Sequence, residues 1–193
     1  MSPFTHLFLG WLVAESAPLT RRERACVALA GAAPDLDGLG MIAEVLTKNS
    51  SHPLLWFSEY HHVLCHNLLA SVVASGVVAV IVSGSLARRA GVAALACLTW
   101  NLHIICDVIG ARGPDGHQWP IVYWRPFATS EWVWSGQWRL DSWQNLVITL
   151  ASLVIITWLA RTRGRTPLEM VSLRADAAVV GVIRKRWPLP QSG

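Results

Sequence analysis

Histidine and aspartate residues gather in four short segments of a chain that is otherwise largely apolar. Imidazole and carboxylate groups together are the usual ligands of zinc and its first-row neighbours. In apolar helices these side chains cost free energy unless they pair with one another or bind a metal. We therefore expect the four segments to converge on a divalent-metal site, with zinc as the first choice of ion. The candidate metal ligands are His6, Asp35, Asp37, His61, His62, His66, His103 and Asp107.

Each segment on its own also has a simpler interpretation. A single histidine on an apolar helix, such as His6, is more often a hydrogen-bonded core residue than a ligand. Asp35 and Asp37 fit a turn that ends a helix, since aspartate favours such positions. His61 and His62 fit a polar face at a membrane interface. The metal site is favoured over these separate interpretations because several of the side chains are expected to meet.

Helix pairing gives the reason for that meeting. The two apolar runs that flank a basic turn near Arg88 are expected to form an antiparallel helical hairpin. Residues at equal depth in such a hairpin have numbers with a constant sum. The turn that carries His62 and His66 therefore faces the turn that carries His103 and Asp107. Within each helix the two ligands are four residues apart, so they are expected to share one helix face.

A second hairpin, turning near Thr20 and Arg21, is expected to place His6 opposite Asp35. Both hairpins then carry ligands at one end and basic residues at the other. The basic clusters lie at residues 21–24, 88–89 and 161–165. Cytoplasmic loops of membrane proteins are enriched in Lys and Arg, so these ends are expected to be cytoplasmic. The metal site is then expected on the outer face of the membrane.

The composition favours a membrane protein. Of the 193 residues, 53% are hydrophobic and 15% are charged, against about 25% charged in typical soluble domains. The net charge is +4, but the basic residues form short clusters without interleaved aromatics, so we expect no binding of nucleic acid. Four cysteines without a CxxC pair predict free thiols rather than disulfides. Thr5 and His6 interrupt the first apolar run, so we expect no cleavable signal peptide.

The apolar runs predict an all-α fold. Residues 67–87 carry no charge and form the strongest transmembrane candidate, followed by residues 90–110 and the shorter run at residues 146–160. The runs at residues 3–14 and 25–33 are short for a full span and are expected to be buried, tilted or re-entrant. We expect a helical bundle of antiparallel hairpins with about three to five membrane-embedded or membrane-associated helices.

A Trp-rich loop region at residues 111–143 holds six of the eleven tryptophans. Indole rings favour the headgroup region of a bilayer, so an aromatic belt at one interface is the expected role. Contacts to substrate or lipid are the other interpretation. We expect one membrane-associated helical metal-site domain over residues 1–165, with this loop inside it, and a C-terminal tail over residues 166–193.

The order and spacing of the four segments resemble the YdjM-like group of bacterial membrane-bound, predicted metal-dependent hydrolases. That group has Thr-His near the N-terminus, Pro-Asp-x-Asp, His-Arg-Gly-x-Thr-His and a later His-x-x-x-Asp. The matching segments here are residues 5–6, 34–37, 61–66 and 103–107, with an aromatic-Pro-Phe segment at residues 124–127. The resemblance spans roughly residues 3–127. It implies a multi-pass protein of the bacterial inner membrane.

The third segment departs from the pattern of the group. His62, Val63, Cys65 and Asn67 stand where the group has Arg, Gly, Thr and Ser. The step from His61 to His66 is retained. His62 is then an extra ligand, a substitute for the contact of that arginine to phosphate or carboxylate, or neither.

The resemblance and the ligand set together predict a membrane-bound metal-dependent hydrolase. The expected reaction uses a metal-activated water, with Asp35 or Asp37 as the general base. Seven main ligand candidates exceed the four positions of one tetrahedral zinc, so two or more ions fit as well. Likeness to helical His/Asp sites of zinc phospholipases and nucleases implies phosphoester substrates. The membrane location makes membrane lipids the expected partners of the protein. The expected substrate is a small molecule or a lipid-linked molecule.

The alternative is a non-catalytic metal-binding or structural integral membrane protein. Metal transport would need a polar path, and residues 70–98 hold no acidic residue or histidine at mid-depth. A structural protein would satisfy its polar groups by mutual hydrogen bonds and would be indifferent to chelators. Metal content and phosphoester turnover separate these alternatives from the hydrolase.

Overall fold

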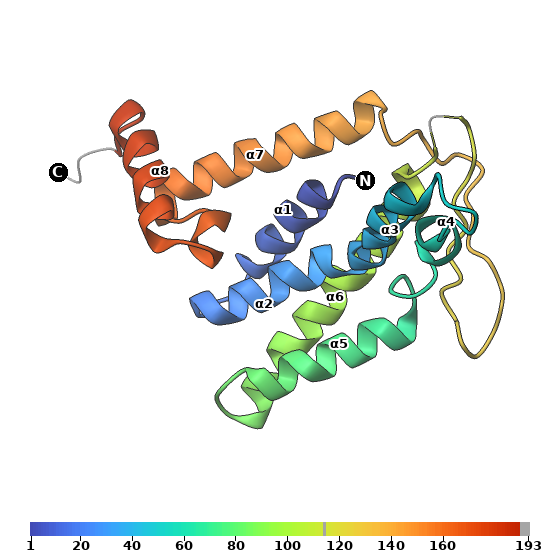
Figure 1. Cartoon of the computed structure of the whole chain (residues 1–193). Coiled ribbons are helices and arrows are strands. Elements are labelled where there is room, and N and C mark those ends of the chain that lie inside the picture. Colours follow the sequence, from blue (N-terminus) through green and yellow to red (C-terminus); the bar gives the residue numbers. More distant parts are fainter. Residues whose placement is uncertain (114, 190–193) are drawn as a thin grey trace.

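The computed structural model describes residues 1–113 and 115–189, and that part of the chain contains helices, turns and loops but no extended strand (Figure 1). In chain order the helical elements are α1 (Pro3–Ala14), α2 (Arg21–Ala32), η1 (Ala33–Leu39), α3 (Gly40–Thr47), α4 (Trp56–Tyr60), α5 (Leu68–Ile81), α6 (Leu86–Gly110), α7 (Trp143–Arg163), η2 (Pro167–Met170) and α8 (Leu173–Arg186). The η elements are 3₁₀ helices. The predicted all-α helical bundle is confirmed.

Two helical hairpins form the centre of the fold. α1 packs along α2, α5 packs along α6, and α2 joins the two hairpins by packing against α6. α7 packs against α1, so in Figure 1 α7 lies on one outer side of the bundle and α5 on the other. The Trp-rich loop region connects α6 to α7 at one end of this bundle.

Close packing of α1 and α2 depends on two glycines. A methyl group at Gly10 would lie 2.8 Å from the Ala28 carbonyl oxygen, and one at Gly31 would lie 3.1 Å from the His6 carbonyl oxygen. Small residues at helix crossings let backbones approach closely in membrane proteins. The crossing therefore brings His6 of α1 next to the end of α2.

Polar side chains cap the N-termini of several helices and explain where they begin. Thr20 and Glu23 form a capping box at the start of α2. The Ser85 side chain caps α6, and the Asn67 side chain caps α5. Such side chains satisfy backbone N–H groups that have no partner within the helix. These caps set the position of each helix relative to the candidate ligands.

The predicted helix through residues 61–66 is wrong. α5 begins at Leu68, and residues 61–66 form an irregular segment between α4 and α5. Asn67 ends this segment because it caps α5 and also donates to the carbonyl groups before it. His62 has a left-handed backbone conformation with φ of 68°. His62 and His66 therefore do not share a helix face, contrary to the prediction from their spacing.

Three helical stretches are long and apolar enough to cross a membrane, namely Arg21–Thr47, Leu86–Gly110 and Trp143–Arg163. The first stretch joins α2, η1 and α3, so the N-terminal run that we predicted to be too short is part of a candidate span. The predicted span at residues 67–87 is wrong in length, because α5 ends at Ile81 and a turn with Gly84 at φ of 120° follows. Both α1 and α5 are shorter apolar helices.

The C-terminal segment, which we predicted as a tail, contains regular structure. η2 packs against α2, and α8 packs against both η2 and α7. The Thr166 backbone N–H donates to the Asp176 carboxylate at 2.7 Å, which ties the start of η2 to α8. The division into a domain at residues 1–165 and a tail at residues 166–193 stays a prediction.

Ion pairs around two buried glutamates connect the ends of α1, α2 and α7 with η2, although the partner arginines Arg163 and Arg165 are 45% and 32% exposed. Glu15, which follows α1, pairs with Arg163 and Arg165 at 2.9 and 2.7 Å. Arg24 of α2 pairs with Glu169 of η2 at 2.6 Å and lies 3.3 Å from Glu15. The two glutamate side chains are 2% and 5% exposed. We call these five residues the basic-end network.

Candidate metal centre

The candidate ligands come from α1, η1, the segment before α5, and α6, whose ends meet away from the basic-end network (Figure 1). Asp35, His66, His103 and Asp107 form a compact group in which one ligand atom of each residue lies within 4.8 Å of the others. The His66, His103 and Asp107 side chains are at most 2% exposed, and that of Asp35 is 16% exposed. A buried group of this kind could hold a metal ion.

The two imidazoles of the group present lone pairs to each other. His103 Nδ1 lies 2.8 Å from the Gly31 carbonyl oxygen, which can only accept, so Nδ1 of the neutral ring carries the proton. His66 Nδ1 faces the Asp37 carboxylate at 3.0 Å in the same way. The two Nε2 atoms are 3.1 Å apart. Asp107 Oδ2 lies 2.9 Å from Nε2 of His103 and 3.5 Å from Nε2 of His66. When both rings are neutral these electron-rich atoms repel one another, and a proton on His66 or a metal cation among them removes that repulsion.

The spacing of the group suits a first-row metal ion. Zinc bonds of about 2.0–2.1 Å in a tetrahedron imply ligand atoms roughly 3.3 Å apart. The separations among the His66, His103 and Asp107 ligand atoms run from 2.9 to 3.5 Å. Asp35 Oδ1 lies 3.5 Å from Nε2 of His103. Oδ2 of Asp35 and Oδ2 of Asp107 are buried without a hydrogen-bond partner among the described residues. The donor types and these two oxygens fit a divalent cation.

Asp37 lies beside this group and orients two of the histidines. Its Oδ1 accepts from His61 Nδ1 at 2.8 Å, and its Oδ2 accepts from His66 Nδ1 at 3.0 Å and from the Cys65 backbone N–H at 3.2 Å. A carboxylate on the second nitrogen of a ligating histidine fixes the tautomer and orientation of the ring. Both oxygens of Asp37 are occupied in this way, whereas Asp35 keeps one oxygen without a partner.

His6 contacts the group from α1. Its ring stacks on His103 with centroids 3.7 Å apart, and its Nε2 lies 3.2 Å from Asp107 Oδ1. The predicted pairing of His6 with Asp35 is wrong in register. The His6 backbone lies beside Gly31, about one helical turn before Asp35, because the two glycines set how α1 and α2 cross.

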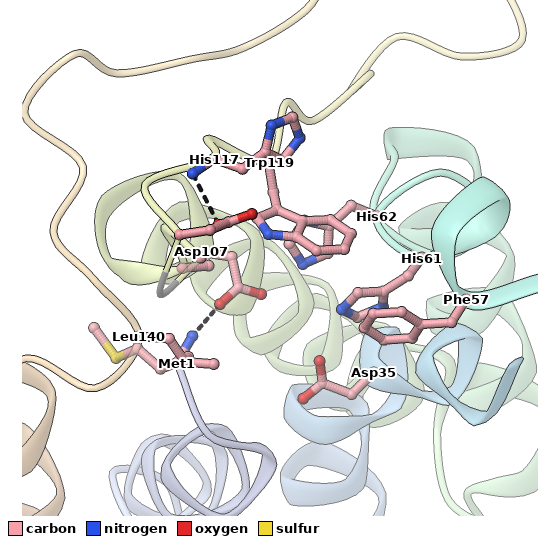
Figure 2. Close-up of a pocket in the computed structure, with 12 residues that line it drawn as sticks. Met1, Asp35, Phe57, His61, His62, Asp107, His117, Trp119 and Leu140 are labelled. Carbon is pink, nitrogen blue, oxygen red and sulfur yellow. Dashed lines mark hydrogen bonds and ion pairs between the residues drawn. The ribbon is translucent and has the colours of Figure 1, made fainter. Parts of the chain in front are cut away.

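A cavity of about 520 Å³ opens beside the group. Figure 2 shows the Asp35 and Asp107 carboxylates and the rings of His61, His62 and Trp119 around the same space. The amino group of the first residue also contacts Asp107 here. A small molecule in this cavity would therefore touch the candidate ligands directly.

Two histidines at the site have pKa values shifted in opposite directions. Burial lowers the pKa of His62 well below its usual value, and the nearby His66 adds to this effect. Burial also disfavours the charged form of His66, but hydrogen bonds to Asp107 and Asp37 outweigh it and raise the pKa of His66 to about 9. The surroundings of His66 therefore favour positive charge, whereas those of His62 keep a neutral ring.

Several contributors to the site were not among the sequence candidates. Phe57 stacks on His61 with ring centroids 4.6 Å apart, and Trp119 lies edge-on to His61 and His62 at 5.6 and 5.3 Å. The Gly31 carbonyl oxygen accepts from His103. The Trp-rich composition marks the region of Trp119, but no side-chain pattern could mark a backbone carbonyl.

Comparisons with curated proteins and with solved structures gave no match. A sequence model of the YdjM inner membrane protein family matches residues 1–185. The match includes all the candidate ligands and runs through most of α8, well beyond the segment that carried the resemblance. The resemblance drawn from the four segments is confirmed, and the chain belongs to the YdjM inner membrane protein family.

Proposed function

We propose that this inner membrane protein is a metal-dependent hydrolase. The observation that carries the proposal is the buried group of Asp35, His66, His103 and Asp107, which borders a cavity. A structural ion is usually enclosed by protein ligands, whereas a catalytic ion keeps a position open to a reactant. Asp35 and Asp107 both line the cavity, so a substrate placed there would reach an ion bound by the group.

In this proposal His66, His103 and Asp107 hold the ion, with zinc as the first choice, and Asp35 is the general base. Three protein ligands leave the fourth position of a tetrahedral zinc for a reactant. The ion supplies, when bound, activation of a water molecule and polarisation of a substrate oxygen. Asp35 lines the cavity and its Oδ2 has no hydrogen-bond partner, so it is free to accept a proton from that water.

The remaining candidates would position these residues. Asp37 holds His66 and His61 through its two oxygens. His6 Nε2 can donate to Asp107 Oδ1, which restricts the rotation of that carboxylate. Partners of this kind keep ligands within a narrow range of orientations and so raise metal affinity. We therefore propose Asp37 as a positioning residue rather than as the base.

Phosphoesters of lipids or of lipid-linked molecules are the proposed substrates. The cavity lies at the end of the bundle where α7 begins with Trp143, whose side chain is 70% exposed. Indole rings favour the depth of the lipid headgroups. Trp119 of the Trp-rich loop lines the cavity as well. These features fit a substrate whose polar head reaches the ion while its tail stays in the bilayer.

We further propose that the site faces the outer side of the inner membrane, because the basic-end network lies at the opposite end of the bundle. His117 is exposed and lines the cavity, and Arg22 is exposed near the basic end. A His117→Cys variant should react with a membrane-impermeant thiol reagent in spheroplasts, and an Arg22→Cys variant should react only after lysis. The reverse pattern would place the site in the cytoplasm.

The activity itself is tested with purified protein in detergent. The zinc-reconstituted wild type should hydrolyse bis(p-nitrophenyl) phosphate or a phospholipid, and His52→Ala, an exposed histidine away from the site, should match it. Asp35→Asn should retain zinc and lose about 100-fold or more in rate, since it removes the base. Equal rates for Asp35→Asn and wild type would contradict the role of Asp35.

The alternative of a non-catalytic metal-binding protein uses the same ligands and predicts a different result in this experiment. Zinc bound by the wild type without hydrolysis of either substrate would favour it. A wild type that binds no metal would favour a structural membrane protein, whose polar groups only satisfy one another.

A further inference from the structure

His62 is a buried histidine whose ring has no hydrogen-bond partner among the described residues. The residue is 5% exposed, and its Nδ1 is buried without a partner. No side-chain hydrogen bond of His62 occurs within residues 1–113 and 115–189. Buried polar groups are almost always hydrogen-bonded, and an unsatisfied one costs free energy. Nδ1 of His62 therefore has no partner among the described residues, and a ligand beside the ring could supply a hydrogen-bond partner.

The backbone of His62 carries a second cost. Its φ of 68° is the left-handed conformation, and the only other residues with positive φ in the described chain are glycines. Such conformations are unfavourable for residues with a Cβ and concentrate at functional sites. The left-handed turn carries the His62 ring next to His61, His66 and Trp119, at centroid distances of 4.2, 4.5 and 5.3 Å. The unfavourable backbone conformation of His62 thus places its ring beside the candidate ligands.

The ring lines the same cavity as the Asp35 and Asp107 carboxylates (Figure 2). His62 is not a member of the compact four-residue group, so it is not placed as a direct ligand of the same ion. Among the described residues that line this cavity there is no Lys or Arg. The amino group of the first residue contacts Asp107, so the other donors that line the cavity belong to neutral side chains and backbone groups. A neutral imidazole offers one such N–H donor.

We propose that His62 is a substrate-contacting residue whose ring N–H donates a hydrogen bond to a phosphoryl oxygen of the substrate in this cavity. The proposal rests on the proposed phosphoester function. His66, His103 and Asp107 would hold the ion, and the His62 ring, which lies beside Trp119, would donate to an oxygen of the phosphoryl group. This contact supplies the partner that the buried ring lacks, and it explains why the chain keeps a non-glycine residue in a left-handed turn.

The test uses inorganic phosphate as the probe and zinc-reconstituted full-length protein in detergent, with binding measured by calorimetry and zinc by elemental analysis. Three substitutions separate the contribution of the His62 ring to phosphate binding from that of its backbone conformation. His62→Asn keeps a donor and tolerates the left-handed conformation, His62→Gly keeps only the conformation, and His62→Ala keeps neither. His52→Ala is the control for loss of an exposed histidine.

We expect wild type and His52→Ala to bind phosphate equally. His62→Gly should bind about tenfold more weakly or worse, because a hydrogen bond to a charged group is lost. His62→Ala should weaken binding at least as much, and His62→Asn should recover part of it. The zinc content should be the same in every variant that folds, and His62→Gly keeps the test valid if His62→Ala is unstable.

Three results would overturn the proposal. Phosphate affinity of His62→Gly equal to that of wild type would show that only the backbone conformation matters. Loss of zinc from His62→Gly would make His62 a ligand of the ion instead. Zinc-bound wild type that binds no phosphate would overturn the proposed phosphoester function together with this contact, whereas the first two results leave that function standing.

Discussion

The two ends of the helical bundle both bury carboxylates, but they satisfy them differently. At the basic-end network, Glu15 and Glu169 face guanidinium groups at 2.6–2.9 Å. An arginine cannot lose its proton, so each negative charge there is balanced by a fixed positive charge. At the metal centre, Asp107 faces imidazoles and the amino group of the first residue, and Oδ2 of Asp35 and Oδ2 of Asp107 have no hydrogen-bond partner among the described residues.

This difference separates a structural charge cluster from a ligand site. Fixed charges with full hydrogen bonding leave nothing for a ligand to add, so the basic-end network ties helices together. Imidazoles can be neutral and offer lone pairs, so a cation bound at the metal centre would add stabilisation there. Substitutions at the basic end should therefore affect folding, and substitutions at the metal centre should affect metal binding.

The largest effect is expected for Glu15→Gln at the basic-end network. This change leaves Arg24 buried without one of its carboxylate partners and removes the ion pairs of Arg163 and Arg165. Removing one partner of a buried ion pair costs about 3–5 kcal/mol; the pair with Arg24 is of this kind, whereas those with the partly exposed Arg163 and Arg165 contribute less. We expect a clear fall in the thermal unfolding midpoint in detergent, with zinc content unchanged at low temperature. A wild-type midpoint would contradict the structural role of this network.

Asp107→Asn is the matched change at the metal centre. It should weaken zinc binding about 100-fold or more, since it removes a charged ligand from the group. The unfolding midpoint of the chelated protein should also fall, because Asp107 pairs with the amino group of the first residue and favours the positive charge of His66. Competition titration with a chromogenic chelator measures the affinity. If Asp107→Asn bound zinc like wild type while destabilising the protein as much as Glu15→Gln, the contrast between the two ends would be lost.

The pH dependence should distinguish the metal centre further, because the pKa of His66 is raised from 6.5 to about 9. A folded-state pKa above the unfolded value stabilises the metal-free protein below pH 6.5, and this contribution is lost as the pH rises through 9. Zinc must displace the same proton, so its affinity should rise by about tenfold per pH unit over this window. Unfolding of chelated protein and zinc titrations at several pH values measure the two trends. A zinc affinity independent of pH would show that His66 is not a ligand.

The smallest of these effects is expected for Asp37→Asn. This change keeps the shape of the residue and weakens its hold on the Nδ1 atoms of His61 and His66. Loss of such a supporting carboxylate typically costs about 10–100-fold in metal affinity, and we expect the lower part of that range because the amide oxygen still accepts. The same zinc competition titration checks it. Abolished zinc binding would instead make Asp37 a direct ligand.

The meeting of His66 with His103 could be predicted although the helix assumed for it was wrong. Residue numbers give the depth of each residue along a hairpin. His66 lies just before the capped start of α5, at the depth expected for a helix that continued through it, and it therefore still meets His103. Which way His62 points depends on its left-handed backbone, which spacing alone does not encode. The prediction of depth therefore succeeded, and the prediction of a shared helix face failed.

The sequence could not separate the roles of Asp35 and Asp37. Both stand in one Pro-Asp-x-Asp motif, but the 3₁₀ helix η1 directs one carboxylate to the cavity and the other to the histidines. The helix α8 was also not predicted, because charged residues interrupt its apolar positions near the start and its end is basic. Its place depends on tertiary contacts with η2 and α7 rather than on local pattern.

Elemental analysis of the detergent-purified protein tests the central claim most directly. The wild type is measured beside a His66→Ala/His103→Ala variant. A His52→Ala/His117→Ala variant, which removes two exposed histidines, is the control. We predict about one or more zinc, manganese or iron ions per chain in the wild type and in the control, and none in the His66→Ala/His103→Ala variant. No metal in the wild type, or full occupancy in the variant, would contradict a metal centre at this end of the bundle.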